Sequence, residues 1–216
     1  NKKENKMAFD YKKEYKEFYM PGKKPSIVEI PKMNYIAVRG KGDPNQENGS
    51  YQNSLKLLYP IAFTIKMSYK GSRNIEGYFE YVVPPLEGFW WQDGISGVDY
   101  SQKDKFNFIS AIRLPDFVSK EDFEWAIDEA SAKKGIDFSP VEFMTMEEGL
   151  CVQCMHIGPY DNEPETVDMM NTFLGEEGYE NDFESGRLHH EIYLSDPRRC
   201  QAQRLKTVIR HPIKKR

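Results

Sequence analysis

The feature that most constrains the fold is an internal repeat, in which two distant segments share the same predicted order of elements. In the first, a strand at 34–39 leads through Gly42-Asp43-Pro44 to a helix at 50–66 and a strand at 78–83. In the second, a strand at 150–157 leads through Gly158-Pro159 to a helix at 164–175 and a strand at 188–194. The spacing is far longer than the roughly 20–50 residues of a solenoid repeat. The alternative is a chance similarity of two strand–helix–strand units.

A true repeat implies two halves packed as one domain with a cleft between them. A shared sheet with helices on one face would leave its other face to line a pocket. The remaining predicted elements are an amphipathic helix at 8–20, a helix from Ser119 to about Lys134, and strands at 26–30, 106–113, 141–146 and 205–211. Pro60 is expected to kink or split the helix at 50–66.

Charge is distributed unevenly along the 216 residues, whose net charge is −4. Residues 1–24 contain eight lysines, and residues 197–216 contain eight Lys or Arg and no acid, so the rest is strongly acidic. An acidic body is a poor nucleic-acid surface, because phosphate contacts dominate such binding. We therefore expect no direct nucleic-acid partner. No apolar stretch approaches the roughly 20 residues of a membrane span, so no membrane partner is expected either.

The cysteines and histidines do not form a recognisable metal or redox motif. Three cysteines are too few for a disulfide scaffold and favour a cytoplasmic location. Cys151 and Cys154 have CxxC spacing, but in a strand they would point to opposite faces. The histidines fit no zinc-binding pattern; they are His156, His189, His190 and His211. We expect no metal and no cofactor.

The strand at 188–194 carries the most suggestive polar pattern. Alternation places His189, Glu191 and Tyr193 on one face, and the mostly apolar residues between them on the face expected to meet the helices. A carboxylate in an aromatic cleft would have a raised pKa, as a general base or a receptor for organic cations requires. The alternative is an exposed edge strand with a polar outer face.

Aromatic residues are dense, at 13% of the chain, and many lie near predicted strand ends. Flat rings suit a planar ligand or an organic cation, although most of them should belong to the core. The ring-bearing candidates for ligand contact are Tyr81, Trp90, Trp91 and Phe108. Glu87 is a further candidate, and Glu80 is a reserve acid that could simply face outward.

Three motifs, in order along nearly the whole chain, resemble the GyrI-like small-molecule-binding family. They are Tyr81-Val82-Val83-Pro84-Pro85-Leu86-Glu87-Gly88 followed by Trp90-Trp91, then His156-Ile157-Gly158-Pro159-Tyr160-Asp161, then His189-His190-Glu191-Ile192-Tyr193-Leu194-Ser195-Asp196-Pro197-Arg198. The resemblance implies an α+β fold, in which two pseudo-symmetric βαββ repeats form one antiparallel sheet with helices on one face and a central ligand cleft. Together, the motifs are specific, whereas any one alone is weak.

The resemblance also implies a domain organisation and a site. We expect an N-terminal helical extension at 1–24 and a single GyrI-like domain at 25–216, with repeats at about 25–115 and 138–216 and the helix 120–134 between them. We expect a small aromatic or cationic ligand, because in relatives fused to DNA-binding domains this module binds effectors, often aromatic cations, and an acidic residue of the last-repeat strand lies in the pocket. Glu191 is the matching position.

Some stand-alone members of the family hydrolyse the cyclopropane ring of cyclopropanoid DNA-alkylating compounds, which protects the cell. Under this hypothesis Glu191 is the base for water, and Tyr193 or Tyr160 donates to the developing oxyanion, with His189 as a further donor. Trp90 or Trp91, with Phe108, would form flat walls.

Three other functions stay open. The first is a binder that sequesters hydrophobic or cationic aromatic compounds without turnover. The second is haem binding, since a haem-binding family is thought to share a related fold. The third is inhibition of DNA gyrase by protein contact, the property of the family's namesake. The oligomeric state and the natural ligand do not follow from the sequence.

Overall fold

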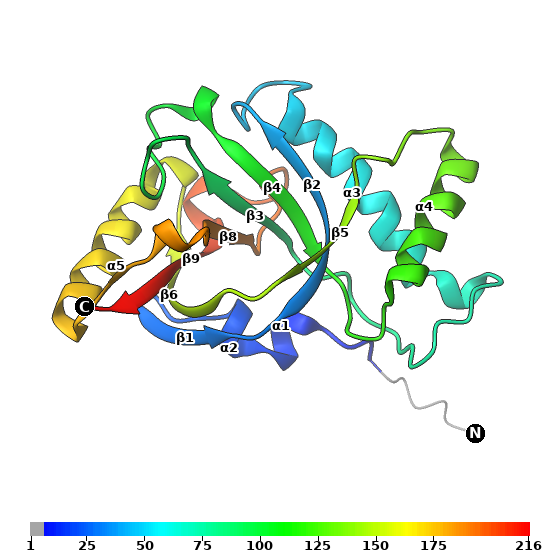
Figure 1. Cartoon of the computed structure of the whole chain (residues 1–216), viewed down its shortest axis with the longest axis horizontal. Coiled ribbons are helices and arrows are strands. Elements are labelled where there is room, and N and C mark those ends of the chain that lie inside the picture. Colours follow the sequence, from blue (N-terminus) through cyan, green and yellow to red (C-terminus); the bar gives the residue numbers. More distant parts are fainter. Residues whose placement is uncertain (1–6) are drawn as a thin grey trace.

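The computed structural model describes residues 7–216, which form an open antiparallel sheet of nine strands flanked by helices (Figure 1). The helices are α1 (Tyr11–Glu14), α2 (Lys16–Tyr19), α3 (Ser50–Lys66), α4 (Lys120–Lys134) and α5 (Glu163–Glu177). The strands are β1 (Ser26–Ile30), β2 (Met33–Lys41), β3 (Leu86–Trp91), β4 (Asn107–Arg113), β5 (Glu142–Met146), β6 (Gly149–Ile157), β7 (Tyr179–Asn181), β8 (His189–Tyr193) and β9 (Lys206–Lys215). Short 3-10 helices are η1 (Ser68–Lys70), η2 (Lys103–Lys105), η3 (Tyr160–Asn162), η4 (Phe183–Ser185) and η5 (Ala202–Arg204).

The sheet is built from two units with the same topology. Its strand order is β1-β6-β9-β8-β3-β4-β2-β5, and β7 pairs with β9 outside this path. β2, α3, β3 and β4 form one unit, β6, α5, β8 and β9 form the other, and the two meet where β3 pairs with β8. The units also exchange edge strands, because β1 pairs with β6 and β5 pairs with β2. The predicted α+β fold with an antiparallel sheet is confirmed.

Most of the predicted elements are confirmed, but the predicted strand at 78–83 is wrong. That segment is irregular apart from an isolated bridge between Phe9 and Tyr81, and the strand lies further on, at Leu86–Trp91. β3 pairs on both sides and is largely buried on both faces, so it lacks the alternation that marks a half-exposed strand. The short β7 was not predicted.

Two helices differ from their prediction. The segment expected as one helix at 8–20 is broken at Tyr15, whose backbone angles (φ −117°, ψ 60°) are not helical. α3 runs unbroken from Ser50 to Lys66 across Pro60. The Thr64 hydroxyl donates to the Pro60 carbonyl, 2.7 Å away, within the same helix. α4 matches its prediction: Ser119 and Asp122 form a capping box, and Gly135 ends it in a left-handed conformation.

Different helices cover the two sides of the sheet. In Figure 1, α5 and α3 lie at the left and right of the sheet, and α1 and α2 lie below it. α3 packs on β2 and β4, and α5 packs on β6, which defines the helix face. On the opposite side, Tyr11 and Tyr19 pack against Tyr81, Ile192 and other buried residues, which defines the N-terminal face. Both faces of the central strands are therefore buried.

Hydrogen bonds fasten the N-terminal segment to the N-terminal face. The Arg210 guanidinium donates to the Phe18 carbonyl at 2.6 Å, and the Gln153 amide donates to the Glu17 carbonyl at 2.6 Å. Arg113 donates to the Tyr19 hydroxyl at 3.2 Å. Residues 1–6 of the expected extension lie outside the described residues. Among the described helices, none has the length and apolar character needed to cross a membrane.

Candidate functional site

The candidate site lies on β8, which is a central strand between β3 and β9 rather than the exposed edge considered from the sequence. As expected from alternation, His189, Glu191 and Tyr193 share one face, and His190 and Ile192 share the other. The expected direction is wrong, however. The N-terminal segment covers the face of His190 and Ile192, and the face of Glu191 and Tyr193 meets Tyr51 of α3 and Glu163 of α5.

Glu191 is the centre of the site and is 8% exposed. One carboxylate oxygen, Oε1, lies 3.0 Å from Nε2 of His189. The other, Oε2, accepts a 2.6 Å hydrogen bond from the Tyr193 hydroxyl. Alternate residues of one strand thus hold the carboxylate from both sides.

An aromatic wall stands beside Glu191. Trp90 donates from its indole Nε1 to the Tyr193 hydroxyl at 3.0 Å, and its ring packs on Phe108 with centroids 5.6 Å apart. Gly88 lies opposite Glu191 in the β3–β8 pairing. A Cβ at Gly88 would lie 2.5 Å from the Trp90 indole nitrogen and 2.9 Å from the Tyr193 hydroxyl. The absence of a side chain there therefore allows Trp90 and Tyr193 to meet.

Glu163, the first residue of α5, is a site residue that the sequence analysis missed. It is 1% exposed, and its Oε2 accepts a 3.1 Å hydrogen bond from the Tyr100 hydroxyl. Its other oxygen is buried and meets no donor among the described residues. Ligand atoms of Glu163, His189 and Glu191 all lie within 4.8 Å of one another. A signal was present in the sequence, since Glu163 follows the Gly158-Pro159-Tyr160 motif at the start of a predicted helix.

The two carboxyl groups are driven to opposite protonation states. Burial, and then the negative charge of Glu191, raise the pKa of Glu163 well above its usual range. Burial also favours the neutral form of Glu191, but hydrogen bonds from Glu163, His189 and Tyr193 outweigh it and lower its pKa. The expected raised pKa of Glu191 is thus wrong. The two shifts favour a proton on Glu163 and a negative charge on Glu191, and a proton on Glu163 would satisfy its oxygen that has no other donor.

Tyr160, in η3, stands at the edge of the same site. Its ring meets that of Tyr193 edge to face with centroids 6.0 Å apart. Burial, and then the charge of Glu191, raise the pKa of Tyr160 to about 12, so its hydroxyl keeps its proton at neutral pH. Unlike the Tyr193 hydroxyl, it makes no hydrogen bond with the described residues. It is free to donate to a ligand.

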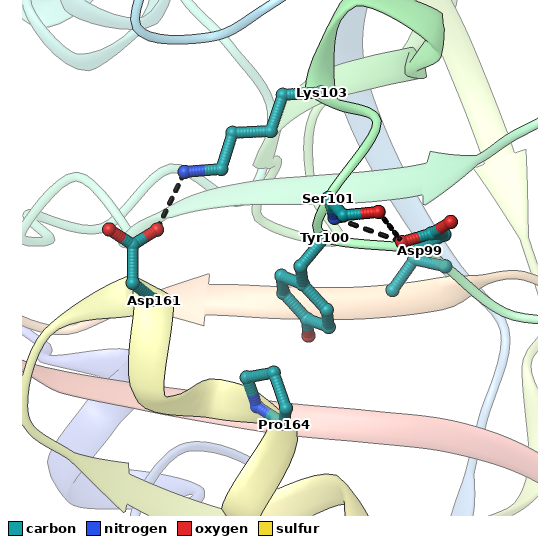
Figure 2. Close-up of a pocket in the computed structure, with 7 residues that line it drawn as sticks. Asp99, Tyr100, Ser101, Lys103, Asp161 and Pro164 are labelled. Atoms are coloured by element: carbon teal, nitrogen blue, oxygen red, sulfur yellow. Dashed lines mark hydrogen bonds and ion pairs between the residues drawn. The ribbon is translucent and has the colours of Figure 1, made fainter.

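A surface cleft of about 610 Å³ adjoins the buried site (Figure 2). Val98, Tyr100 and Pro164 line it, and so do Lys103 and Asp161, whose ammonium and carboxylate are paired at 2.6 Å. Tyr100 belongs to the β3–β4 loop, and its hydroxyl reaches Glu163. The Tyr100 ring therefore separates the cleft from the two carboxyl groups.

Three sequence candidates do not reach this site. Tyr81 packs under the N-terminal helices, and Trp91 packs against a core cluster on the N-terminal face. Glu87 lies opposite Ile192 in the β3–β8 pairing, and His190 Nε2 is 2.8 Å from its Oε1. The expectation that these three line the ligand site is not met. The residues that the structure brings together are Glu191, Tyr193, Tyr160, Trp90 and His189, whereas Phe108 is fully buried and packs on Trp90 in a core cluster with Phe106.

The histidines are engaged by protein groups. His189 and His190 each contact partners at both ring nitrogens, and His156 contacts Thr166 and the Pro159 carbonyl. None of these three rings offers a free nitrogen to haem, and Nδ1 of the fourth, His211, has no partner among the described residues but is buried. Glu163, His189 and Glu191 are the described group with metal-ligand spacing.

Comparisons with known proteins agree on the fold. Residues 23–214 match the family model of the GyrI-like small molecule binding domain. A Listeria innocua structure described as an uncharacterized conserved protein is 47% identical, covers 95% of this chain and 100% of its own, and has a TM-score of 0.89. Another from the same organism, described as a hydrolase, is 45% identical with the same coverage and a TM-score of 0.86.

A more distant relationship shows only the fold. The C-terminal domain of EcmrR is 14% identical, with 89% of this chain and 98% of that domain covered and a TM-score of 0.53. A comparison with curated proteins finds no match.

Proposed function

Because this chain belongs to the GyrI-like family of small-molecule-binding domains, we propose that it hydrolyses the three-membered ring of cyclopropanoid alkylating compounds. The observation that carries the proposal is the buried Glu191 carboxylate, which His189 and Tyr193 hold by hydrogen bonds beside the Trp90 ring and next to Glu163. A pair of acids with opposed protonation states is a common arrangement in sites that move protons. The description of a 45% identical relative as a hydrolase supports the same class of reaction.

The chemistry requires a base, flat walls and an oxyanion donor. The substrate ring is a spirocyclopropane conjugated to a dienone. Glu191 takes a proton from water, the water oxygen bonds to a ring carbon, and the strained carbon–carbon bond breaks. Its electron pair moves to the carbonyl oxygen, which becomes a phenolate. Proton transfer to the phenolate completes the addition of one water and restores the carboxylate.

The oxyanion forms on the far side of the dienone from the carbon that water attacks. Its donor must therefore stand away from the base, on another element. Tyr160 in η3 fits this requirement, and its hydroxyl has no partner among the described residues. Tyr193 fits less well, because its hydroxyl already donates to Glu191 and accepts from Trp90. We assign Tyr160 as the oxyanion donor.

Glu163 acts through Glu191 in this scheme. As a neutral acid it donates to Glu191 and helps to keep the base ionised. Substrate reaches the pair through the cleft beside Tyr100, so the Tyr100 ring must swing away from Glu163 for water and ligand to meet Glu191.

The proposal is tested by turnover with a Glu191→Gln variant. A catalytic amount of protein is incubated with a duocarmycin-type cyclopropanoid, and the product is followed by liquid chromatography and mass spectrometry. We expect many turnovers with the wild type and a fall of about 10²–10⁴-fold in kcat for the variant, the range for loss of a general base. Equal rates for the two proteins would remove Glu191 from the mechanism.

A non-catalytic binder is the second candidate, because an ionised carboxylate beneath aromatic rings also attracts organic cations. The same experiment separates the two functions. Protection of the compound with no product in excess over protein would favour sequestration.

A further inference from the structure

We propose that His211 is a positioning residue that fixes the tautomer of His189 and thereby makes His189 a permanent hydrogen-bond donor to Glu191. This inference rests on the proposed function, since it concerns how the base of that site is held. His211 lies on β9, outside the motifs that the sequence analysis connected with the site.

The three residues form a continuous chain of contacts across two strands. The pairing of His190 with Arg210 sets the register of β8 and β9 and brings His189 beside His211. Nδ1 of His189 lies 2.6 Å from Nε2 of His211, and Nε2 of His189 lies 3.0 Å from Oε1 of Glu191. All three side chains are buried. Each of these two short contacts therefore requires one proton, which one of the two atoms donates to the other.

The direction of both hydrogen bonds follows from His211, the residue at the other end of this series of contacts from Glu191. Nδ1 of His211 is buried and has no hydrogen-bond partner among the described residues. A proton there would be a buried donor without an acceptor, which is costlier than an unused lone pair. Neutral His211 therefore carries its proton on Nε2 and donates to Nδ1 of His189. His189, now an acceptor at Nδ1, carries its own proton on Nε2 and donates to Glu191.

The surroundings keep His211 neutral, and no donor among the described residues reaches its Nδ1. Burial, followed by the neighbouring His189, keeps the pKa of His211 well below its usual range. The Phe183 ring packs on His211 with centroids 5.0 Å apart, and the Tyr100 ring packs on His189 at 6.1 Å. The charged or titratable groups facing His189 are Glu191 on its own strand, His211 on β9, Glu163 on α5 and Tyr100 on the β3–β4 loop.

Two amide variants at this position form a matched pair. In His211→Gln the side-chain amide reaches the place of Nε2, so it can still donate to His189. In His211→Asn the shorter amide corresponds to Nδ1 and cannot. The two substitutions introduce the same chemical group, so they differ mainly in where the N–H stands.

The first readout is the tautomer itself, measured by nitrogen-15 nuclear magnetic resonance of the histidine rings without any substrate. We expect His189 in the wild type to carry its proton on Nε2, with Nδ1 as an acceptor. His211→Gln should keep this signature, and His211→Asn should lose it. A wild-type His189 protonated on Nδ1 and not on Nε2 would overturn the proposal, and this arm needs no variant to fold.

The second readout is the pH profile of kcat/KM for cyclopropanoid hydrolysis. In His211→Asn we expect its acidic limb to move to higher pH and kcat/KM at pH 6 to fall about tenfold, as loss of support for one charge-assisted hydrogen bond implies. His211→Gln should follow the wild type. A purely structural role would lower the rate of both variants at every pH and would contradict the proposal. Absence of wild-type turnover would defeat the proposed function alone, because the tautomer measurement stands without it.

Discussion

Glu191 differs from Glu148, another buried acid, in the kind of partner that holds it. Glu148 lies 3.2 Å from the Arg210 guanidinium and 2.9 Å from His190, so fixed positive charge compensates it. Glu191 is held instead by the Tyr193 hydroxyl, the His189 imidazole and a carboxylic acid. No Arg or Lys lies against Glu191 among its described contacts, so no fixed positive charge cancels its own, and it stays able to accept a proton or attract a cation.

A first prediction concerns Glu163. If its role is to donate a proton to Glu191, Glu163→Gln keeps a donor and should retain kcat within about tenfold, whereas Glu163→Leu removes the hydrogen bond and should lose more. The measurement is kcat for both variants beside Glu191→Gln. A Glu163→Gln variant as inactive as Glu191→Gln would show that Glu163 itself exchanges a proton with the substrate.

A second prediction concerns the oxyanion donor. Tyr160→Phe removes a hydroxyl that is not needed by any described protein group. It should therefore reduce kcat by about 10²–10³-fold, the usual effect of losing one oxyanion donor, with little change in thermal stability. Steady-state kinetics and a melting curve measure the two effects. Unchanged kcat would return the assignment to Tyr193, with Tyr193→Phe as the comparison.

At the scale of elements, the sequence predicted β8 well and β3 poorly. The alternation in β8 correctly separated His189, Glu191 and Tyr193 from their neighbours, since side-chain period depends only on the strand. The direction of each face depends on what covers it, and the N-terminal helices that cover the His190 side are a tertiary feature. β3 was missed because a strand buried on both faces has no alternation.

Glu163 and His211 were missed for a related reason. Each joins the site only because its element packs against β8: α5 brings Glu163, and the register of β9 brings His211. Neither position has a pattern of its own. Periodicity within one strand could therefore find Glu191 and Tyr193, but not the partners that set their protonation.

The β3–β4 loop gives a third prediction. Tyr100 separates the cleft from the carboxyl groups, so Tyr100→Ala should open the site and raise the association rate of a planar aromatic ligand. Stopped-flow quenching of tryptophan fluorescence measures this rate. Lys103→Ala is a useful comparison, because it removes only the exposed ion pair with Asp161, which should contribute little. An association rate unchanged by Tyr100→Ala would mean that ligands reach Glu191 by another path.

At the scale of the whole molecule, β8 divides two buried polar systems. Glu191 and its partners occupy the helix face, while His190, Glu87, Glu148 and Arg210 form a charged network on the N-terminal face. Because Arg210 also donates to the Phe18 carbonyl, this second network anchors the N-terminal segment. We infer that it serves stability.

This division leads to a fourth prediction, on stability and pH. Burial opposes the charge of Glu148, but His190 and Arg210 lower its pKa from 4.5 to about 2. The contribution of ionised Glu148 to the free energy of unfolding is therefore present above about pH 4.5 and is lost as the pH falls toward 2. Burial alone would lower the pKa of His190, but the neighbouring carboxylates raise it above 6.5. The contribution of His190 to the free energy of unfolding is therefore full below pH 6.5 and is lost as the pH rises through the raised pKa.

The network should therefore stabilise the fold most between about pH 4.5 and 6.5. Glu148→Gln should lower the free energy of unfolding there by about 3–5 kcal/mol, with a difference that shrinks toward pH 2. Melting temperatures of both proteins across this range provide the measurement. Glu142→Gln, which removes an exposed pair with Arg39, is the control and should have little effect. A pH-independent difference for Glu148→Gln would contradict this account.

The central claim is that Glu191 activates water against a strained ring, and labelled water tests it most directly. The protein, in catalytic amount, is given a cyclopropanoid in water enriched in oxygen-18, beside Glu191→Gln and a sample without protein. The account predicts product in large excess over protein, with one labelled oxygen on the former ring carbon, and at least about a 100-fold loss in the variant. Product formed at the rate of the sample without protein would contradict it.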